Sequence, residues 1–386
     1  MLRAGRRGLR PGAPRVSRRA TGSSVRRPAV YRGFPRQTEK GNDVTTRSAV
    51  RIATVAVATA LTLSTASTAF ASQPRTVDLG VLPGGTGGFA FDVNNKGSIV
   101  GHANNAGGVN RAVLWDARGL ITDLGTLPGD TSATAYTINE KGTAVVGQSL
   151  VPGGAARPVK WTPDGTATAL ATPAGTTVSR AYSVNDSGTV VGFSSAADGL
   201  YKAQRWSRDG TRTQLPALPG DTAAGAGWIN NSGTSAGYSK SAAGAMTAVT
   251  WSPGGTVNRL TGLPGHDSYQ ASAISDTAIV VGNSYTGTTS HAVRWDRDGA
   301  PQELSPLPGD TAAGAYGVND LGVVIGFSTD AAGVHRAVKW SANGTAKALP
   351  GVSAGNAQAF GVNNRGTVVG FSTGSAGVSR ATKWKG

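Results

Sequence analysis

The sequence contains no cysteine in its 386 residues. This absence excludes a disulfide framework and any metal site with thiolate ligands. Charged residues make up only 15% and aromatic residues only 6%, so a core must be built mainly from smaller apolar side chains such as Ala and Val. Glycine, by contrast, is abundant, with 56 copies. These glycines follow no three-residue period, which excludes a collagen-like chain.

The positive charge is concentrated at the beginning of the chain. The formal net charge is +16, but residues 1–71 alone carry 14 Lys and Arg against two acids, Glu39 and Asp43. A nucleic-acid-binding protein needs its basic residues on the folded surface that meets phosphate. Here most of them lie in an Arg-, Pro- and Gly-rich tract without apolar periodicity. We therefore expect no nucleic-acid partner.

Residues 44–71 have the three parts of a secretory signal peptide. Two arginines flank the start of a short apolar stretch at residues 52–61, and Ala69-Phe70-Ala71 follows as a small-residue cleavage site. The apolar stretch is too short and too rich in Thr and Ser to predict a membrane span. Cleavage after Ala71 would give a secreted protein with no membrane span.

Residues 1–43 form a basic low-complexity extension, which is longer than the positive region of a usual signal peptide. One hypothesis is that translation begins at Val44 and that residues 1–43 are a mis-assigned start. In either case the mature protein comprises residues 72–386 and is extracellular, with association to the cell wall as a variant of this expectation.

Residues 72–386 contain seven copies of one unit. In each copy a tryptophan ends a short alternating segment, and a glycine and an alanine recur at the same spacing of about 45 residues. The three sets are Trp115, Trp161, Trp206, Trp251, Trp295, Trp340 and Trp384; Gly101, Gly147, Gly192, Gly237, Gly282, Gly326 and Gly370; and Ala90, Ala135, Ala181, Ala226, Ala271, Ala315 and Ala359. Such a period indicates a supersecondary unit that buries its faces against its neighbours.

Each copy contains four short strand-like segments separated by Gly-containing tight turns. In the third copy these segments are residues 181–184, 189–193, 202–206 and 211–215. No segment shows a helical period. Four antiparallel strands repeated seven times predict an all-β fold, a seven-bladed β-propeller. An open solenoid is the alternative architecture.

The two ends of the repeat region complement each other. The last copy ends shortly after Trp384 and lacks its fourth strand, whereas residues 75–79 at the start of the region form a spare one. We therefore predict that residues 75–79 pair with residues 381–384 and close the ring. Closure removes the exposed sheet edges that an open array would leave.

Most repeated residues have a structural explanation. The small Ala suits a crowded inner strand, and the Trp fills the space between adjacent blades. In the Asn-x-x-Gly turns, Asn bonds its own backbone and Gly supplies a positive φ. Asp130, Asp221 and Asp310 follow Leu-Pro-Gly segments, where we interpret them as turn caps because no copy gathers the oxygen ligands that calcium needs.

Catalytic and metal-binding motifs are not found. None of the four histidines has metal-ligand spacing, and there is neither a nucleophile elbow nor a phosphate-binding Gly loop. His291 occupies a strand position that holds Arg, Lys or Thr in other copies. We therefore predict no catalytic residue, no metal ion and no cofactor.

One copy, between Trp251 and Trp295, departs from the pattern. Its Asn-x-x-Gly turn is replaced by residues 275–278, and its loops hold large polar side chains where other copies have small ones. The candidate ligand-binding residues are His266, Asp267, Tyr269 and Tyr285. Strand alternation could place Tyr285 on the other face, and neutral variation of surface loops is the alternative explanation.

The repeated unit also has a recognisable order of motifs. It reads Leu-Pro-Gly-Asp-Thr, then Ala-Tyr-x-Val-Asn-x-x-Gly-x-Val-Val-Gly, then His-Ala-Val or Arg-Ala-Val before x-Trp. Over residues 76–386 it resembles the HAF family of extracellular repeats. His291-Ala292-Val293 is nearest to the tripeptide that names the family, although no copy has its Phe. The resemblance implies a secreted bacterial repeat protein and brings no catalytic residues.

These features predict a monomeric, secreted, non-catalytic module for binding or scaffolding. Recognition would use loops on the face that carries the Leu-Pro-Gly connections. Loops rich in Gly, Ala and Ser suggest a polysaccharide, cell-wall or protein surface as partner. One alternative is a carbohydrate lyase or hydrolase, which needs paired carboxylates or a His/Tyr acid–base set. Another is a structural envelope or spore-coat protein.

Overall fold

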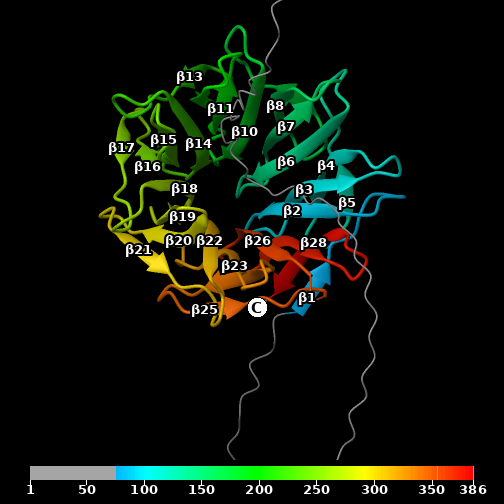
Figure 1. The fold of residues 1–386 in the computed structure, drawn as a ribbon. Helices are drawn as coiled ribbons and strands as arrows, with labels where there is room; N and C mark the ends of the chain where they lie inside the picture. Colours follow the sequence, from blue (N-terminus) through cyan, green and yellow to red (C-terminus); the bar gives the residue numbers. More distant parts are fainter. Residues whose placement is uncertain (1–74, 354, 386) are drawn as a thin grey trace, which may run out of the picture. The chain divides into compact units, whose positions relative to one another are not determined.

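The computed structural model describes residues 75–353 and 355–385. The predictions for residues 1–43 and for the signal peptide at residues 44–71 lie outside them. All 28 elements of the described residues are strands, in seven four-stranded antiparallel sheets. Figure 1 shows these sheets as blades around a central axis. The predicted seven-bladed β-propeller is confirmed. Among the described residues, no helix is long and apolar enough to span a membrane.

Six blades follow the chain from the axis outward as simple meanders. They are β2 (Gly88–Val93), β3 (Ile99–Asn104), β4 (Asn110–Trp115) and β5 (Ile121–Asp123); β6 (Ser132–Ile138), β7 (Val145–Leu150), β8 (Ala156–Trp161) and β9 (Ala167–Ala169); β10 (Val178–Val184), β11 (Val190–Ser195), β12 (Tyr201–Trp206) and β13 (Arg212–Gln214); β14 (Ala223–Ile229), β15 (Ser235–Lys240), β16 (Met246–Trp251) and β17 (Val257–Arg259); β18 (Ser268–Ile274), β19 (Val280–Thr286), β20 (Thr289–Trp295) and β21 (Pro301–Leu304); and β22 (Ala312–Val318), β23 (Val324–Thr329), β24 (His335–Trp340) and β25 (Ala346–Ala348).

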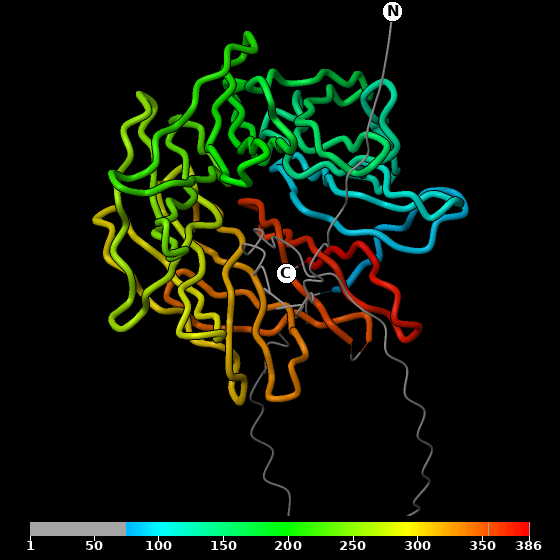
Figure 2. The backbone as a smooth tube through the Cα atoms, turned by 45° about the horizontal axis from the view of Figure 1, so that its top comes forward, coloured from blue at the N-terminus to red at the C-terminus, as the bar shows by residue number. Residues whose placement is uncertain are grey.

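The seventh blade combines both ends of the described chain. It consists of β26 (Ala357–Val362), β27 (Val368–Thr373), β28 (Ser379–Lys385) and β1 (Arg75–Asp78). β1 pairs antiparallel with β28, with Arg75 opposite Lys385 and Asp78 opposite Thr382. Figure 2 shows the first and last described segments side by side. The predicted ring closure is confirmed, and it excludes the open solenoid.

The seven tryptophans fill the contacts between blades, and none is more than 1% exposed. Trp251, for example, shares a cluster with Val191 and Leu215 of the preceding blade. Its indole Nε1 donates a hydrogen bond of 2.7 Å to the carbonyl oxygen of Pro216. The packing interpretation of the repeated tryptophan is therefore confirmed.

The repeated glycine has a steric cause. Each inner strand has a register shift directly after the repeated alanine, so that one residue of the inner strand has no partner on the second strand. Opposite this bulge, a Cβ on any of the seven glycines would lie 1.9–2.0 Å from a carbonyl oxygen of the inner strand. Because no Cβ tolerates such a contact, each blade requires glycine at this position.

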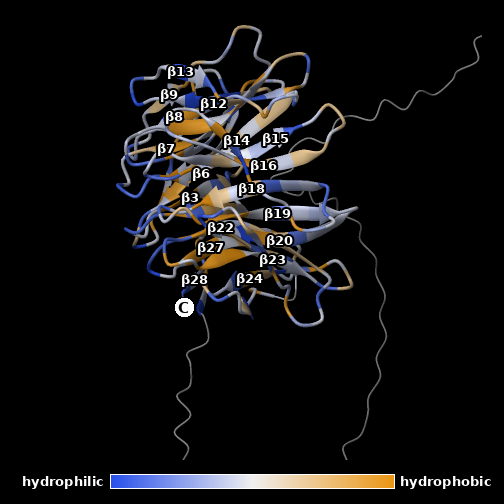
Figure 3. Cartoon of the chain, turned by 90° about the vertical axis from the view of Figure 1, so that its left-hand side faces the viewer, coloured by the Kyte–Doolittle hydropathy of each residue, from blue (hydrophilic) through white to orange (hydrophobic). Residues whose placement is uncertain are grey.

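Successive turns of a meander alternate between the two ends of its strands, so the ring has two different faces. The Leu-Pro-Gly face carries the Leu-Pro-Gly connections and the loops between second and third strands. The Asn-turn face carries the Asn-x-x-Gly turns and the turns between third and fourth strands. In a side view, hydrophobic residues gather in the strands and hydrophilic residues in the loops (Figure 3).

Candidate functional site

Two of the four candidate residues, Tyr269 and Tyr285, lie on opposite faces of one sheet. Tyr269 stands opposite Ser284 and packs into the core shared with the preceding blade. Tyr285 stands opposite Ser268, and its hydroxyl accepts a hydrogen bond of 3.3 Å from Gln270 Nε2. Burial raises the pKa of Tyr285. Alternation along β18 and β19 therefore separates the two tyrosines.

The other two candidates lie in the loop before β18. Asp267 is exposed. His266 is half-buried, with Nδ1 2.8 Å from Ser284 Oγ and its ring centroid 4.7 Å from that of His291. His291 lies within β20, as predicted for a strand residue, and its Nδ1 is 2.8 Å from a carboxylate oxygen of Glu303. The structure thus brings His266 next to His291, which was not among the predicted ligand-binding residues.

The aspartates after the Leu-Pro-Gly segments bond to the third or second strand of their own blade. Asp130 forms an ion pair of 2.7 Å with Arg157, and its side chain is only 1% exposed. Asp310 forms the equivalent pair with Arg336, and Asp221 accepts a hydrogen bond from a serine of β15. Turn capping was therefore the wrong interpretation. Among the described residues, no group of three or more His, Asp or Glu side chains suits a metal ion.

Aromatic rings line the central channel. The bulged residue after the repeated alanine is aromatic in five blades, and these rings contact one another around the axis. In order they are Tyr182, Tyr136, Phe91, Phe360 and Tyr316, with successive ring centroids 5.2–5.8 Å apart. The fourth and fifth blades have Gly227 and Ser272 at this position. We call the five rings the aromatic arc; it is interrupted at these two blades.

The row of rings continues from the aromatic arc towards the Leu-Pro-Gly face. Phe193 lies 5.7 Å from Tyr182 and 4.3 Å from Tyr201, measured between ring centroids. Tyr201 is the first residue of β12 and directly follows a loop of that face. Tyr182 and Tyr201 are half-buried. The third blade therefore presents a continuous aromatic surface from the channel to the loops.

Arg180 lies within this aromatic surface. Its guanidinium carbon is 5.9 Å from the centroid of the Phe193 ring, and Nη1 makes a long contact of 3.5 Å with the hydroxyl of Tyr182. Its Nε is buried and has no hydrogen-bond partner. Among residues 75–353 and 355–385, no carboxylate forms an ion pair with Arg180.

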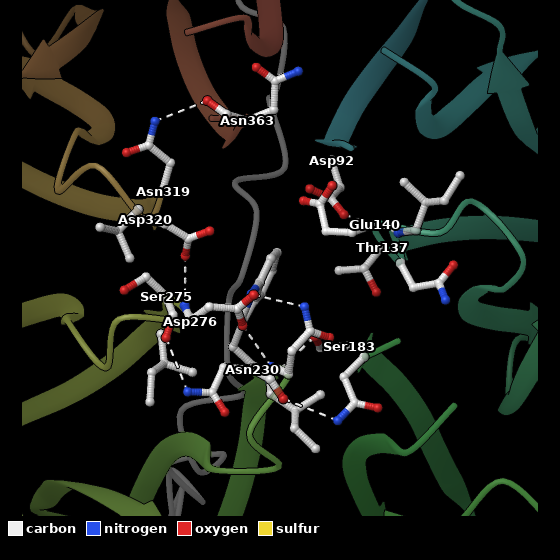
Figure 4. Close-up of a pocket in the computed structure, with 18 of the residues that line it drawn as sticks. Asp92, Thr137, Glu140, Ser183, Asn230, Ser275, Asp276, Asn319, Asp320 and Asn363 are labelled. Carbon is white, nitrogen blue, oxygen red and sulfur yellow. Dashed lines mark hydrogen bonds between the residues drawn. The ribbon is translucent and has the colours of Figure 1, made fainter. Parts of the chain in front are cut away.

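The Asn-turn face closes the other end of the channel with hydrogen bonds between blades. In every blade, a side chain of the turn accepts a bond of 2.6–2.9 Å from a backbone N–H of a neighbouring turn. The accepting residues are Glu140, Asp186, Asn231, Asp276, Asp320, Asn364 and Asn95. We call these seven residues the Asn-turn belt; Figure 4 labels three of them, Glu140, Asp276 and Asp320.

The asparagines that begin the turns reinforce this belt. Their side-chain oxygens accept hydrogen bonds from their own turns, as predicted; Asn230 Oδ1, for example, accepts from the N–H of Thr234 at 2.9 Å. In addition, five of their amide nitrogens donate to a carbonyl oxygen of the next blade. The turn is thus both a local structure and a contact between blades.

Two carboxyl groups near the Asn-turn face, those of Asp92 and Glu140, have raised pKa values. Burial raises the pKa of Asp92 to about 6, although two backbone N–H groups bond its oxygens. Burial and three neighbouring carboxylates raise the pKa of Glu140 to about 7. The cavity beside them has a volume of about 90 Å³, less than the roughly 150 Å³ that admits one benzene ring. This cavity therefore offers space for water rather than for a ring-sized ligand.

No family model matches the sequence, and no curated protein matches it. Several solved structures match the fold. A streptogramin B lyase is 13% identical with a TM-score of 0.55, covering 81% of this chain and 97% of that chain. Virginiamycin B lyase from Staphylococcus aureus is 12% identical with a TM-score of 0.55, covering 81% of this chain and 99% of that chain. At these identities the similarity shows the propeller fold alone.

Proposed function

We propose that the chain is a secreted, monomeric, non-catalytic binding or scaffold module of the HAF extracellular repeat type. It recognises a polysaccharide, cell-wall or protein surface through the Leu-Pro-Gly face. The observation that carries this proposal is the half-buried aromatic surface of the third blade, which reaches that face at Tyr201. Recognition sites are often lined by aromatic side chains and are often formed by surface loops.

The enzymatic alternative has less support. A carbohydrate lyase or hydrolase needs an acid and a base that converge on one bond. Tyr269 and Tyr285 lie on opposite faces of their sheet, and His266 bonds to Ser284. The acidic pair Asp92 and Glu140 is engaged by backbone N–H groups beside a small cavity. Neither set leaves an acid and a base side by side over a substrate-sized space.

The experiment is a pull-down of the purified full chain with peptidoglycan, chitin, cellulose and soluble glycans at two salt concentrations. We expect saturable binding to at least one of them that survives high salt. Tyr201→Ala should weaken that binding. The matched control is Leu321→Ala, which removes a 65% exposed apolar side chain from the Asn-turn face and should leave binding unchanged.

Three results would contradict the proposal in different ways. Loss of binding in Leu321→Ala but not in Tyr201→Ala would assign recognition to the Asn-turn face. Absence of binding to every glycan would remove the polysaccharide and cell-wall partners. Tight association of the native protein with the cell fraction, without saturable binding, would favour the structural-coat alternative.

A further inference from the structure

Arg180 is a cation without a counter-charge in the described part of the chain. Burying a guanidinium is unfavourable unless an anion or several hydrogen-bond acceptors replace the water that it loses. Here it has one long contact to a phenol oxygen and a buried Nε with no acceptor. The Phe193 ring, at 5.9 Å, replaces only part of that solvation.

Two other arginines of the ring make several hydrogen bonds each, although the Nε of Arg205 is also buried without a partner. Arg205 donates to the carbonyl oxygens of Gly233, Ser252 and Pro253, and Arg157 pairs with Asp130 through two nitrogens. These arginines join loops or blades, and their hydrogen bonds explain their positions. No comparable contact explains Arg180. An anion bound beside Arg180 would supply the counter-charge that it lacks.

The surroundings of Arg180 restrict the chemistry of that anion. A guanidinium matches the geometry of a planar oxyanion, which it can bind through two parallel hydrogen bonds. A single cation balances one negative charge and so fits a carboxylate better than a phosphate dianion. Tyr182 and Tyr201 lie beside it in the same aromatic surface, and aromatic faces pack well against the apolar faces of sugar rings.

We propose that Arg180, with Tyr182 and Tyr201, forms a subsite for the carboxylate of an acidic glycan. This inference rests on the proposed function and specifies the ligand of the same face. Uronate polymers and peptidoglycan both carry carboxylates on or beside sugar rings, so either is a source of this chemistry. The aromatic side chains pack against the sugar, and the guanidinium binds its charged group.

The test uses the full chain and a ligand pair with the same sugar backbone: polygalacturonate, whose carboxyl groups are charged, and its fully methyl-esterified form, whose carboxyl groups are neutral. We expect the acid to bind at least about tenfold more tightly than the ester, because charge-assisted hydrogen bonds are lost on esterification. Arg180→Gln should abolish this preference, whereas Arg180→Lys should keep part of it. The control Arg118→Gln changes an arginine whose side chain is 86% exposed on the Asn-turn face and should have no effect. Peptidoglycan in the same assay distinguishes the two sources.

A second readout does not depend on the choice of polymer. Because Arg180→Gln removes an unpaired buried charge, the melting temperature of the free protein should stay the same or rise. Glucuronate, but not glucose, should raise the melting temperature of the native chain and not that of the variant. A lower melting temperature for Arg180→Gln would show a structural role and overturn the inference.

The outcomes separate the two proposals. Glycan binding that does not distinguish acid from ester, or that Arg180→Gln leaves intact, overturns the carboxylate subsite and leaves the binding module standing. Stabilisation by glucuronate that requires Arg180, without binding of any polymer, supports the subsite and contradicts polysaccharide recognition. Absence of both overturns both proposals.

Discussion

The side chains at the Asn-turn end of the central channel repeat from blade to blade, whereas those further along the channel vary. At the Asn-turn face every blade makes the same contact, in which a turn side chain accepts a hydrogen bond from the backbone of a neighbouring turn. Further along the channel the blades differ. The residue after the repeated alanine is aromatic in five blades and small in two, and the third blade, one of the five, also carries the guanidinium of Arg180.

This difference indicates how a repeat protein divides its tasks. A contact that closes the ring must recur in all blades, because each blade meets two equivalent neighbours. A ligand, by contrast, touches the ring from one side and needs different groups in different blades. Repeated residues therefore report architecture, and residues that break the repeat at a shared position are the better candidates for recognition.

Removing the closing strand β1 should weaken the contacts between blades at both faces of the ring. Of the changes considered, it should reduce the free energy of unfolding most. Deletion of residues 72–80 removes β1, and opening the ring exposes the contacts of β2 with β26, including the bond of 2.9 Å from Asn363 Nδ2 to the carbonyl oxygen of Asn94. We expect a loss of at least about 4 kcal/mol in the free energy of unfolding, measured by chemical denaturation.

A milder variant serves as control for this deletion. Asp78→Asn removes only the partly exposed ion pair with Arg380 and should cost no more than about 1 kcal/mol. If the deletion melts like the native chain, the ring does not depend on β1, and the closure described here is not what stabilises it.

The next effect compares a repeated position, Gly237, with an irregular one ten residues before it, Gly227. In Gly237→Ala the new Cβ would lie 2.0 Å from the carbonyl oxygen of Gly225, and we expect a loss of at least about 3 kcal/mol. In Gly227→Ala nothing lies closer than 3.8 Å to the new Cβ, and the change should stay within about 0.5 kcal/mol. Urea denaturation of both variants measures the difference, and equal midpoints would contradict the steric explanation of the repeated glycine.

The sequence was sufficient to predict the seven-bladed ring and its closure, but not the side-chain contacts along its central channel. The tryptophan period and the spare strand at residues 75–79 predicted the blade number and the closure. The Asn-x-x-Gly turns had a complete local explanation, so their bonds to a turn about 45 residues away could not be anticipated. The aromatic residues after the repeated alanine were visible in the sequence, but only the bulge turns them towards the axis.

The irregular fifth blade shows a second limit of sequence patterns. Substitutions there correctly marked a departure from the repeat, yet Tyr269 and Tyr285 point to opposite sides of one sheet. Arg180 gave no sequence signal, because a single arginine in an inner strand is ordinary until its lack of partners is known. That Tyr269, Tyr285 and Arg180 bind a ligand stays a prediction.

The smallest effect belongs to the Asn-turn face alone and depends on pH. Burial raises the pKa of Glu140 in the folded protein from 4.5 to about 7, so the folded state binds its proton more tightly than the unfolded state does. Stability from this group is therefore present below about pH 4.5 and is lost as the pH rises through 7. Glu140→Gln keeps an oxygen for the N–H of Asn95 and removes the charge.

We expect native protein and Glu140→Gln to unfold at similar denaturant concentrations near pH 4.5. At pH 8 the variant should be more stable by at most about 2 kcal/mol, less than the full pKa shift would give, because Glu140 is partly exposed and water screens its charge. Asp298→Asn, at an exposed carboxylate of an outer turn, is the matched control and should follow the native pH profile. Binding at the Leu-Pro-Gly face should be the same in native protein and Glu140→Gln, because the Asn-turn belt holds the blades together and does not form the proposed recognition surface. A variant that changed glycan binding as well would show that the two ends of the channel are coupled.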